Sequence, residues 1–180
     1  MLPTFSPKLP GLNISVGSFL PRILLPSSQE LELAPIDMVE PGALAVCIYN
    51  PAAVNPFPLP PPGVDYPARM AMLAERRVGF YVISGLAIPR LASWREQVGL
   101  DIPYLSDTKG AFATEVGIPM KQVDDRNFRT HAAFVLHEDR VLAILLEADL
   151  IHHFEWILSA LDVTAGREPG VYELPDKPTY

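Results

Sequence analysis

Ala43-Leu44-Ala45-Val46-Cys47-Ile48-Tyr49 is a continuous apolar run. Pro41-Gly42 precedes it and Asn50-Pro51 follows it, and both pairs contain residues that interrupt regular structure. A short apolar run between such breakers is typical of a strand whose two faces are both covered, as in the parallel part of an α/β sheet. The run therefore predicts a central strand, and the rest of the chain must supply its neighbours and covering helices.

Segments with strand and helix patterns alternate on both sides of this run. Apolar residues recur at helical spacing after Pro67, and a proline suits the first turn of a helix. The polar connection His137-Glu138-Asp139-Arg140 suits an antiparallel hairpin between two apolar strands. The order predicts an α/β fold with a central mixed sheet flanked by helices. The predicted elements are an N-terminal hairpin at 22–25 and 31–33, strands at 43–49, 80–84, 102–105, 130–136 and 141–146, and helices at 67–77, 93–99, 111–116 and 151–161.

The length and composition favour one domain. The chain has 180 residues, of which 49% are hydrophobic, and this is enough apolar material for one buried core. Helical and strand periodicity is lost after Leu161. We expect an N-terminal extension at residues 1–15, a single domain at residues 16–161, and a C-terminal tail at residues 162–180.

The charge and hydropathy of the chain exclude some classes of partner. The formal net charge is -7 and the sequence pI is about 5.0, which argues against surfaces that bind nucleic acid or anionic membranes, because both need basic patches. The longest apolar stretches are far shorter than the roughly 20 residues of a membrane helix. Residues 1–11 lack the charged and apolar segments of a secretory signal, so we expect a cytoplasmic protein.

Four short motifs lie in or next to the predicted strands. They are Val16-Gly17-Ser18-Phe19-Leu20-Pro21, Ala45-Val46-Cys47-Ile48-Tyr49-Asn50-Pro51, Gly99-Leu100-Asp101-Ile102-Pro103-Tyr104-Leu105-Ser106-Asp107, and Ala133-Phe134-Val135-Leu136-His137-Glu138-Asp139. Together with the element order, they resemble the peroxiredoxin family (alkyl hydroperoxide reductase/thiol-specific antioxidant), and in particular its bacterioferritin comigratory branch, over roughly residues 16–161. The third motif is the most specific. The resemblance implies a thioredoxin-like fold of peroxiredoxin type.

The resemblance breaks at the residue that carries the family's chemistry. In that family, a strand ending in Tyr-Pro leads to a loop in which the peroxidatic cysteine lies about seven residues beyond the proline, its thiolate stabilised at a helix N-terminus. Counting from Pro51 leads to Pro58, and counting back from Ile83-Ser84 leads to Leu59. No thiol lies in this loop, so the sequence predicts a protein that has lost thiol peroxidase activity and serves as a binding or structural module.

The resemblance also locates a vestigial pocket. Asn55 takes the place of the family's loop threonine, and His131 takes the place of the arginine that positions the peroxide. Arg129 lies two residues earlier, and in one continuous strand it would share a face with His131. With Pro58 and Leu59, these residues form the predicted pocket. A further hypothesis is that the chain is a small-molecule binder, or an enzyme with different chemistry, that uses Arg129, His131 or Asn55 in the same pocket. Thioredoxin-type folds host several activities, so the fold does not decide between these functions.

Cys47 is the only cysteine of the chain, so no intramolecular disulfide can form. Its place inside an apolar strand favours the neutral, unreactive thiol and a packing role. The alternative function is that of a one-cysteine thiol peroxidase or oxidoreductase in antioxidant defence. Such an enzyme would act through Cys47 with an external thiol reductant such as thioredoxin.

The remaining polar residues indicate no metal or cofactor. His152 and His153 are neighbours on a predicted helix and point about 100° apart, which makes a poor pair of ligands. His131 and His137 would lie about 20 Å apart along a strand, too far to share a metal. The polar stretch with Lys121 and Asp124-Asp125-Arg126 is more typical of a solvated loop than of the alternative, a ligand-binding segment.

The proline-rich loop 56–62 is a candidate contact with a protein partner. Its prolines favour an extended backbone of the kind that aromatic grooves recognise. The favoured interpretation is that the loop folds onto its own domain, with Phe57 and Leu59 in the emptied peroxide pocket, because this would bury both side chains. A homo-oligomer is the other partner that we expect.

Overall fold

The computed structural model describes residues 11–51, 63–123, 125–138, 140–147 and 153–164. Within these ranges, the longest helices have 11 residues each. None of the helices in the described ranges is long and apolar enough to cross a membrane.

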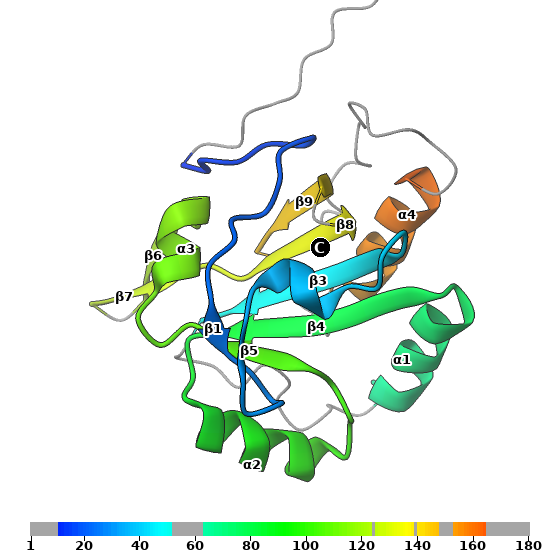
Figure 1. Ribbon diagram of the computed structural model, residues 1–180, viewed down its shortest axis with the longest axis horizontal. Helices are drawn as coiled ribbons and strands as arrows, with labels where there is room; N and C mark the ends of the chain where they lie inside the picture. Colours follow the sequence, from blue (N-terminus) through cyan, green and yellow to red (C-terminus); the bar gives the residue numbers. More distant parts are fainter. Residues whose placement is uncertain (1–10, 52–62, 124, 139, 148–152, 165–180) are drawn as a thin grey trace, which may run out of the picture.

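A five-stranded mixed sheet forms the centre of the molecule (Figure 1), as the sequence predicts. The strand order is β5-β4-β3-β8-β9. β3 pairs in parallel with β4, which pairs in parallel with β5, whereas β8 pairs antiparallel with both β3 and β9. The strands are β3 (Leu44–Asn50), β4 (Val78–Ser84), β5 (Tyr104–Ser106), β8 (Ala132–His137) and β9 (Arg140–Leu146).

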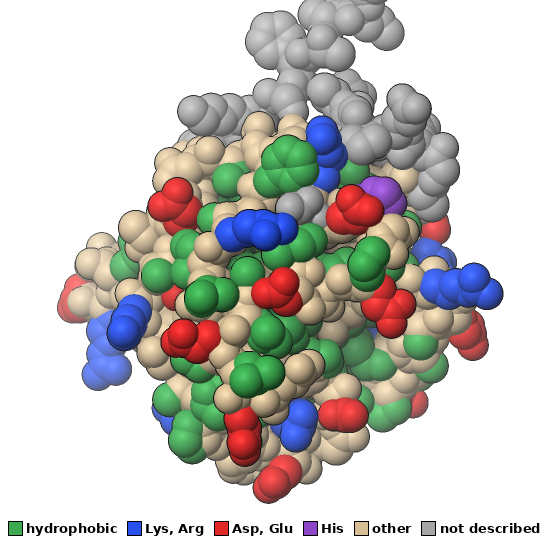
Figure 2. All heavy atoms as spheres, viewed as in Figure 1, with side chains coloured by type: hydrophobic (Ala, Val, Ile, Leu, Met, Phe, Trp, Pro, Cys, Tyr) green, Lys and Arg blue, Asp and Glu red, His purple; other side chains and the backbone are tan. Residues whose placement is uncertain are grey.

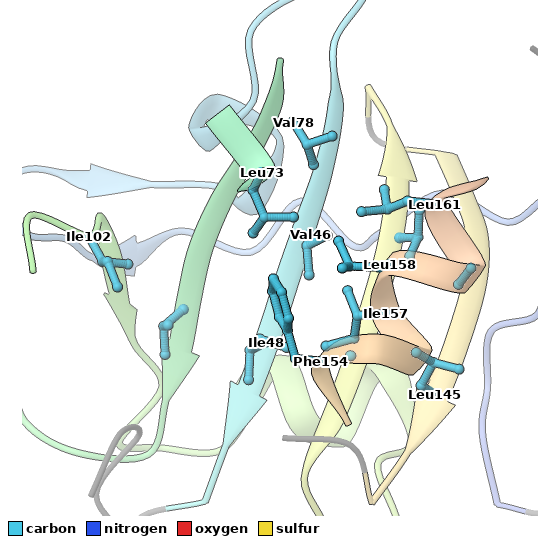
Figure 3. Packing of buried hydrophobic residues seen from close by; sticks show 14 of the residues in the cluster. Val46, Ile48, Leu73, Val78, Ile102, Leu145, Phe154, Ile157, Leu158 and Leu161 are labelled. Carbon is cyan, nitrogen blue, oxygen red and sulfur yellow. The ribbon is translucent and has the colours of Figure 1, made fainter. Parts of the chain in front are cut away.

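Three helices cover one face of this sheet. Side chains alternate along β3, so Val46 and Ile48 point to this face and pack in one apolar cluster with residues of all three helices. Figure 3 shows Phe154 and Ile157 directed toward these two strand residues. The buried apolar surface, rather than the propensity of short helices, stabilises this layer. The helices are α1 (Tyr66–Glu75), α2 (Ile88–Val98) and α4 (Phe154–Thr164).

The opposite face is covered by the N-terminal segment, residues 11–38, and by α3 (Ala111–Val116). The N-terminal segment contains β1 (Leu25–Pro26) and β2 (Glu32–Leu33), which pair as the predicted hairpin, and a short 3-10 helix, η1 (Pro35–Met38). It passes in front of the sheet in Figure 1. Figure 2 shows acidic, basic and apolar side chains interspersed over this face, without a continuous basic region.

The N-terminal segment also pairs with both edges of the sheet. The Gly17 N–H donates to the Val141 carbonyl on β9 at 2.8 Å, and the Ser28 N–H donates to the Tyr104 carbonyl on β5 at 3.0 Å. Edge strands expose unpaired backbone groups that other chains can join, and covering them is a common protection. The segment therefore pairs with part of each edge strand as well as covering one face of the sheet.

Residues that the sequence assigned to the N-terminal extension belong to this layer. Leu12 is buried, the Asn13 N–H donates to the Val116 carbonyl at 2.8 Å, and the Asn13 Nδ2 donates to the Glu115 carbonyl at 3.0 Å. These bonds satisfy carbonyls that the end of α3 leaves without helical partners. At the other end of the chain, α4 continues to Thr164, three residues past the expected boundary at Leu161.

A second hairpin replaces the solvated loop that the sequence predicts from Lys121 to Arg126. β6 (Met120–Val123) pairs antiparallel with β7 (Arg126–Arg129). The turn contains Asp125 with a φ of 60°, a conformation that aspartate adopts more readily than most residues. The loop prediction was wrong because both strands are short and five of their eight residues are polar, so they lack the apolar alternation by which a strand is recognised.

Candidate functional site

Cys47 lies in the middle of β3 and is fully buried, with an exposed fraction of 0%. Its register neighbours are Tyr81 on β4 and Phe134 on β8. Burial raises the pKa of the Cys47 thiol far above its ordinary value, and the adjacent Tyr81 hydroxyl opposes this shift only in part. The thiol is therefore neutral at physiological pH and has no contact with solvent.

The Tyr81 hydroxyl is the polar group next to the Cys47 sulfur. Tyr81 is fully buried, and its hydroxyl has no nitrogen or oxygen partner among the described residues. Burial raises the pKa of Tyr81 well above its ordinary value, and the neighbouring cysteine raises it further. A thiolate is normally stabilised by a cation or a helix N-terminus. The Tyr81 phenol supplies neither, so the two side chains form a neutral pair inside the core.

A row of small polar residues marks the carboxyl ends of the parallel strands. Asn50, Ser84 and Ser106 are in register on β3, β4 and β5, and all three are buried. Ligands of open α/β sheets usually bind at this edge. Here the Ser106 Oγ donates to the Leu86 carbonyl at 2.7 Å, and the Ser84 Oγ accepts from the Leu86 N–H at 3.2 Å. The two hydroxyls thus hold the loop that follows β4.

Asp107 follows β5 and anchors α3. Its carboxylate is buried, with Oδ1 accepting from the Phe112 N–H at 3.1 Å and Oδ2 from the Ala113 N–H at 3.0 Å. Burial raises the pKa of this carboxyl from its ordinary value, while the helix N–H groups and Arg129 act in the opposite direction. The residue acts as a side-chain cap for the first turn of α3, which packs against the Cys47 face of the sheet.

Arg129 lies at the end of β7 and holds the other end of α3. Its Nη1 donates to the Ile118 carbonyl at 2.6 Å, and its Nη2 donates to the Thr114 Oγ1 at 2.8 Å. Burial raises the pKa values of the Tyr49 phenol and the Asp107 carboxyl, and the Asp107 charge raises that of Tyr49 further. The positive charge of Arg129 opposes both shifts only in part. The guanidinium thus lies near the carboxyl ends of β3 and β5, where it serves the packing of α3.

Of the predicted pocket residues, the structure describes Arg129 and His131, and these two do not lie on one strand. Arg129 ends β7, whereas His131 lies in the connection before β8, so the two do not belong to one strand and strand alternation does not apply to them. The His131 carbonyl accepts from the Glu147 N–H at 2.8 Å. Asn55, Pro58 and Leu59 lie outside the described residues, as does the whole proline-rich loop 56–62.

Asp107 and Tyr49 are among the residues of this region that the sequence did not single out. Both lie within the quoted motifs, but their partners on α3 and β7 come from later in the chain. In the described ranges, no group of three or more His, Cys, Asp or Glu side chains could hold a metal ion.

Comparisons with known proteins agree with the fold. No family model matches the chain, and no curated protein matches it. Among solved structures, a cysteine-to-serine mutant of PrxQ from Xylella fastidiosa has a TM-score of 0.68 at 14% identity, over 86% of this chain and 99% of that one. The peroxidoxin BcpB of Mycobacterium tuberculosis has a TM-score of 0.63 at 22% identity, over 84% of this chain and 98% of its own.

A bacterioferritin comigratory protein of Xanthomonas campestris, studied for alkyl peroxide reduction, has a TM-score of 0.61 at 15% identity, over 78% of this chain and 90% of its own. These likenesses confirm the predicted thioredoxin-like fold of peroxiredoxin type, and they are likenesses of fold because the identities are low.

Proposed function

We propose that this chain uses a peroxiredoxin-type fold as a binding or structural module and does not reduce peroxides through a thiol. The observation that carries the proposal is the position of its only cysteine. Cys47 lies inside β3, fully buried between the strands that carry Tyr81 and Phe134. A thiol in that place cannot meet a peroxide unless the core of the domain opens.

The chemistry of peroxide reduction makes this burial decisive. A thiolate attacks one oxygen of the O–O bond and becomes a sulfenic acid, while the other oxygen leaves with a proton. An ordinary cysteine at pH 7 is a few per cent thiolate. Because burial raises the pKa of Cys47, its thiolate fraction is far lower. The low thiolate fraction and the burial of Cys47 therefore both support the proposal.

The polar groups at the carboxyl edge of the sheet support the same proposal. The Ser106 hydroxyl, the Asp107 carboxylate and the Arg129 guanidinium are all bonded to backbone or side-chain groups of the protein. A catalytic site needs groups aimed at the place where charge develops on the substrate. Here these three groups hold a loop and α3, so their observed contacts are those of a structural network.

A binding or structural role implies partners, and we include two in the proposal. One is a second copy of the chain, and the other is a protein that contacts the proline-rich loop 56–62, as its composition suggests. We also place the protein in the cytoplasm, where an unpaired cysteine is usual. Light scattering of the purified chain tests the first partner: a mass of a single chain at all concentrations would remove the homo-oligomer from the proposal.

A peroxide-consumption assay tests the loss of activity. The wild-type chain and Cys47→Ser are each incubated with hydrogen peroxide or an alkyl hydroperoxide and with dithiothreitol or thioredoxin as the reductant. We expect both proteins to consume peroxide at the rate of the reductant alone. Turnover by the wild type that is lost in Cys47→Ser would establish the one-cysteine thiol peroxidase instead. Equal turnover by both proteins would point to chemistry elsewhere, with His131 and Arg129 the first residues to replace.

A further inference from the structure

We draw no further inference here: the strongest candidate, the shallow groove between the β6–β7 hairpin and the end of β9 where the Thr130 hydroxyl is buried without a hydrogen-bond partner among the described residues, carries nothing because its charged side chains, Lys121 and Glu147, already pair with each other and nothing in the structure shows what covers it.

Discussion

Replacing Asp107 with alanine tests the network that holds α3 over the Cys47 face of the sheet. Asp107 is 2% exposed, and its carboxylate accepts backbone hydrogen bonds from Phe112 and Ala113. Leaving a buried donor without a partner costs about 1–3 kcal/mol, and part of this is offset because a buried charge is removed. With two donors affected, we expect the free energy of unfolding to fall by about 2–4 kcal/mol.

Urea unfolding followed by tryptophan fluorescence measures this change, because Trp94 is buried in the core. The matched control is Asp101→Ala, since Asp101 lies just before β5 with its side chain 99% exposed and 3.3 Å from Arg95. An exposed ion pair contributes about 0–1 kcal/mol. Asp107→Asn keeps one acceptor oxygen, so we expect an intermediate loss. If Asp107→Ala and Asp101→Ala lower stability equally, Asp107 is not the anchor of α3.

Two further predictions concern the same part of the molecule. A Cβ added at Gly117, where φ is 76°, would lie 2.5 Å from the Gly11 carbonyl oxygen, whereas one added at Gly110, where φ is 66°, would meet no atom within 4 Å. Both substitutions share the cost of placing alanine in a left-handed backbone, so we expect the contact to make Gly117→Ala lower the free energy of unfolding by about 1–2 kcal/mol more than Gly110→Ala does. Equal losses in urea unfolding would show that the contact with the Gly11 carbonyl has no such effect. Because the pKa of Asp107 is raised above its ordinary value of 3.8, the folded state takes up a proton before the unfolded state as the pH falls. As the pH is lowered toward 3.8, the free energy of unfolding of the wild type in urea should therefore rise relative to that of Asp107→Asn. A relative fall in this pH range would show that folding lowers the pKa of Asp107 instead of raising it.

The central part of the fold could be predicted because its signals are local. The apolar run from Ala43 to Tyr49 marks β3 almost to the residue, and Gly99 marks the end of α2 through its left-handed conformation. The hairpin β6–β7 could not be predicted, since its strands are short and mostly polar. The hydrogen bonds from Asn13 to the end of α3 could not be predicted either, because the bonded residues lie about a hundred positions apart.

The candidate site was predictable to a smaller extent. The burial of Cys47 followed from its apolar surroundings, and the structure confirms it. The roles of Asp107 and Arg129 were not predictable, because they depend on where α3 packs against the sheet rather than on a spacing in the chain. Strand alternation did not relate Arg129 to His131, because the chain leaves one strand and enters another between them.

Thiol labelling in the native protein addresses the state of Cys47 without any assumption about a substrate. A chromogenic disulfide reagent at neutral pH is added to the folded chain and to the chain in denaturant, with Cys47→Ser as the blank. A core residue reacts through opening of the fold, and an opening free energy of about 4 kcal/mol slows labelling roughly a thousandfold. We predict at least this ratio between the two rates. Labelling of the folded chain within tenfold of the denatured rate would contradict the conclusion that Cys47 is a buried, unreactive thiol.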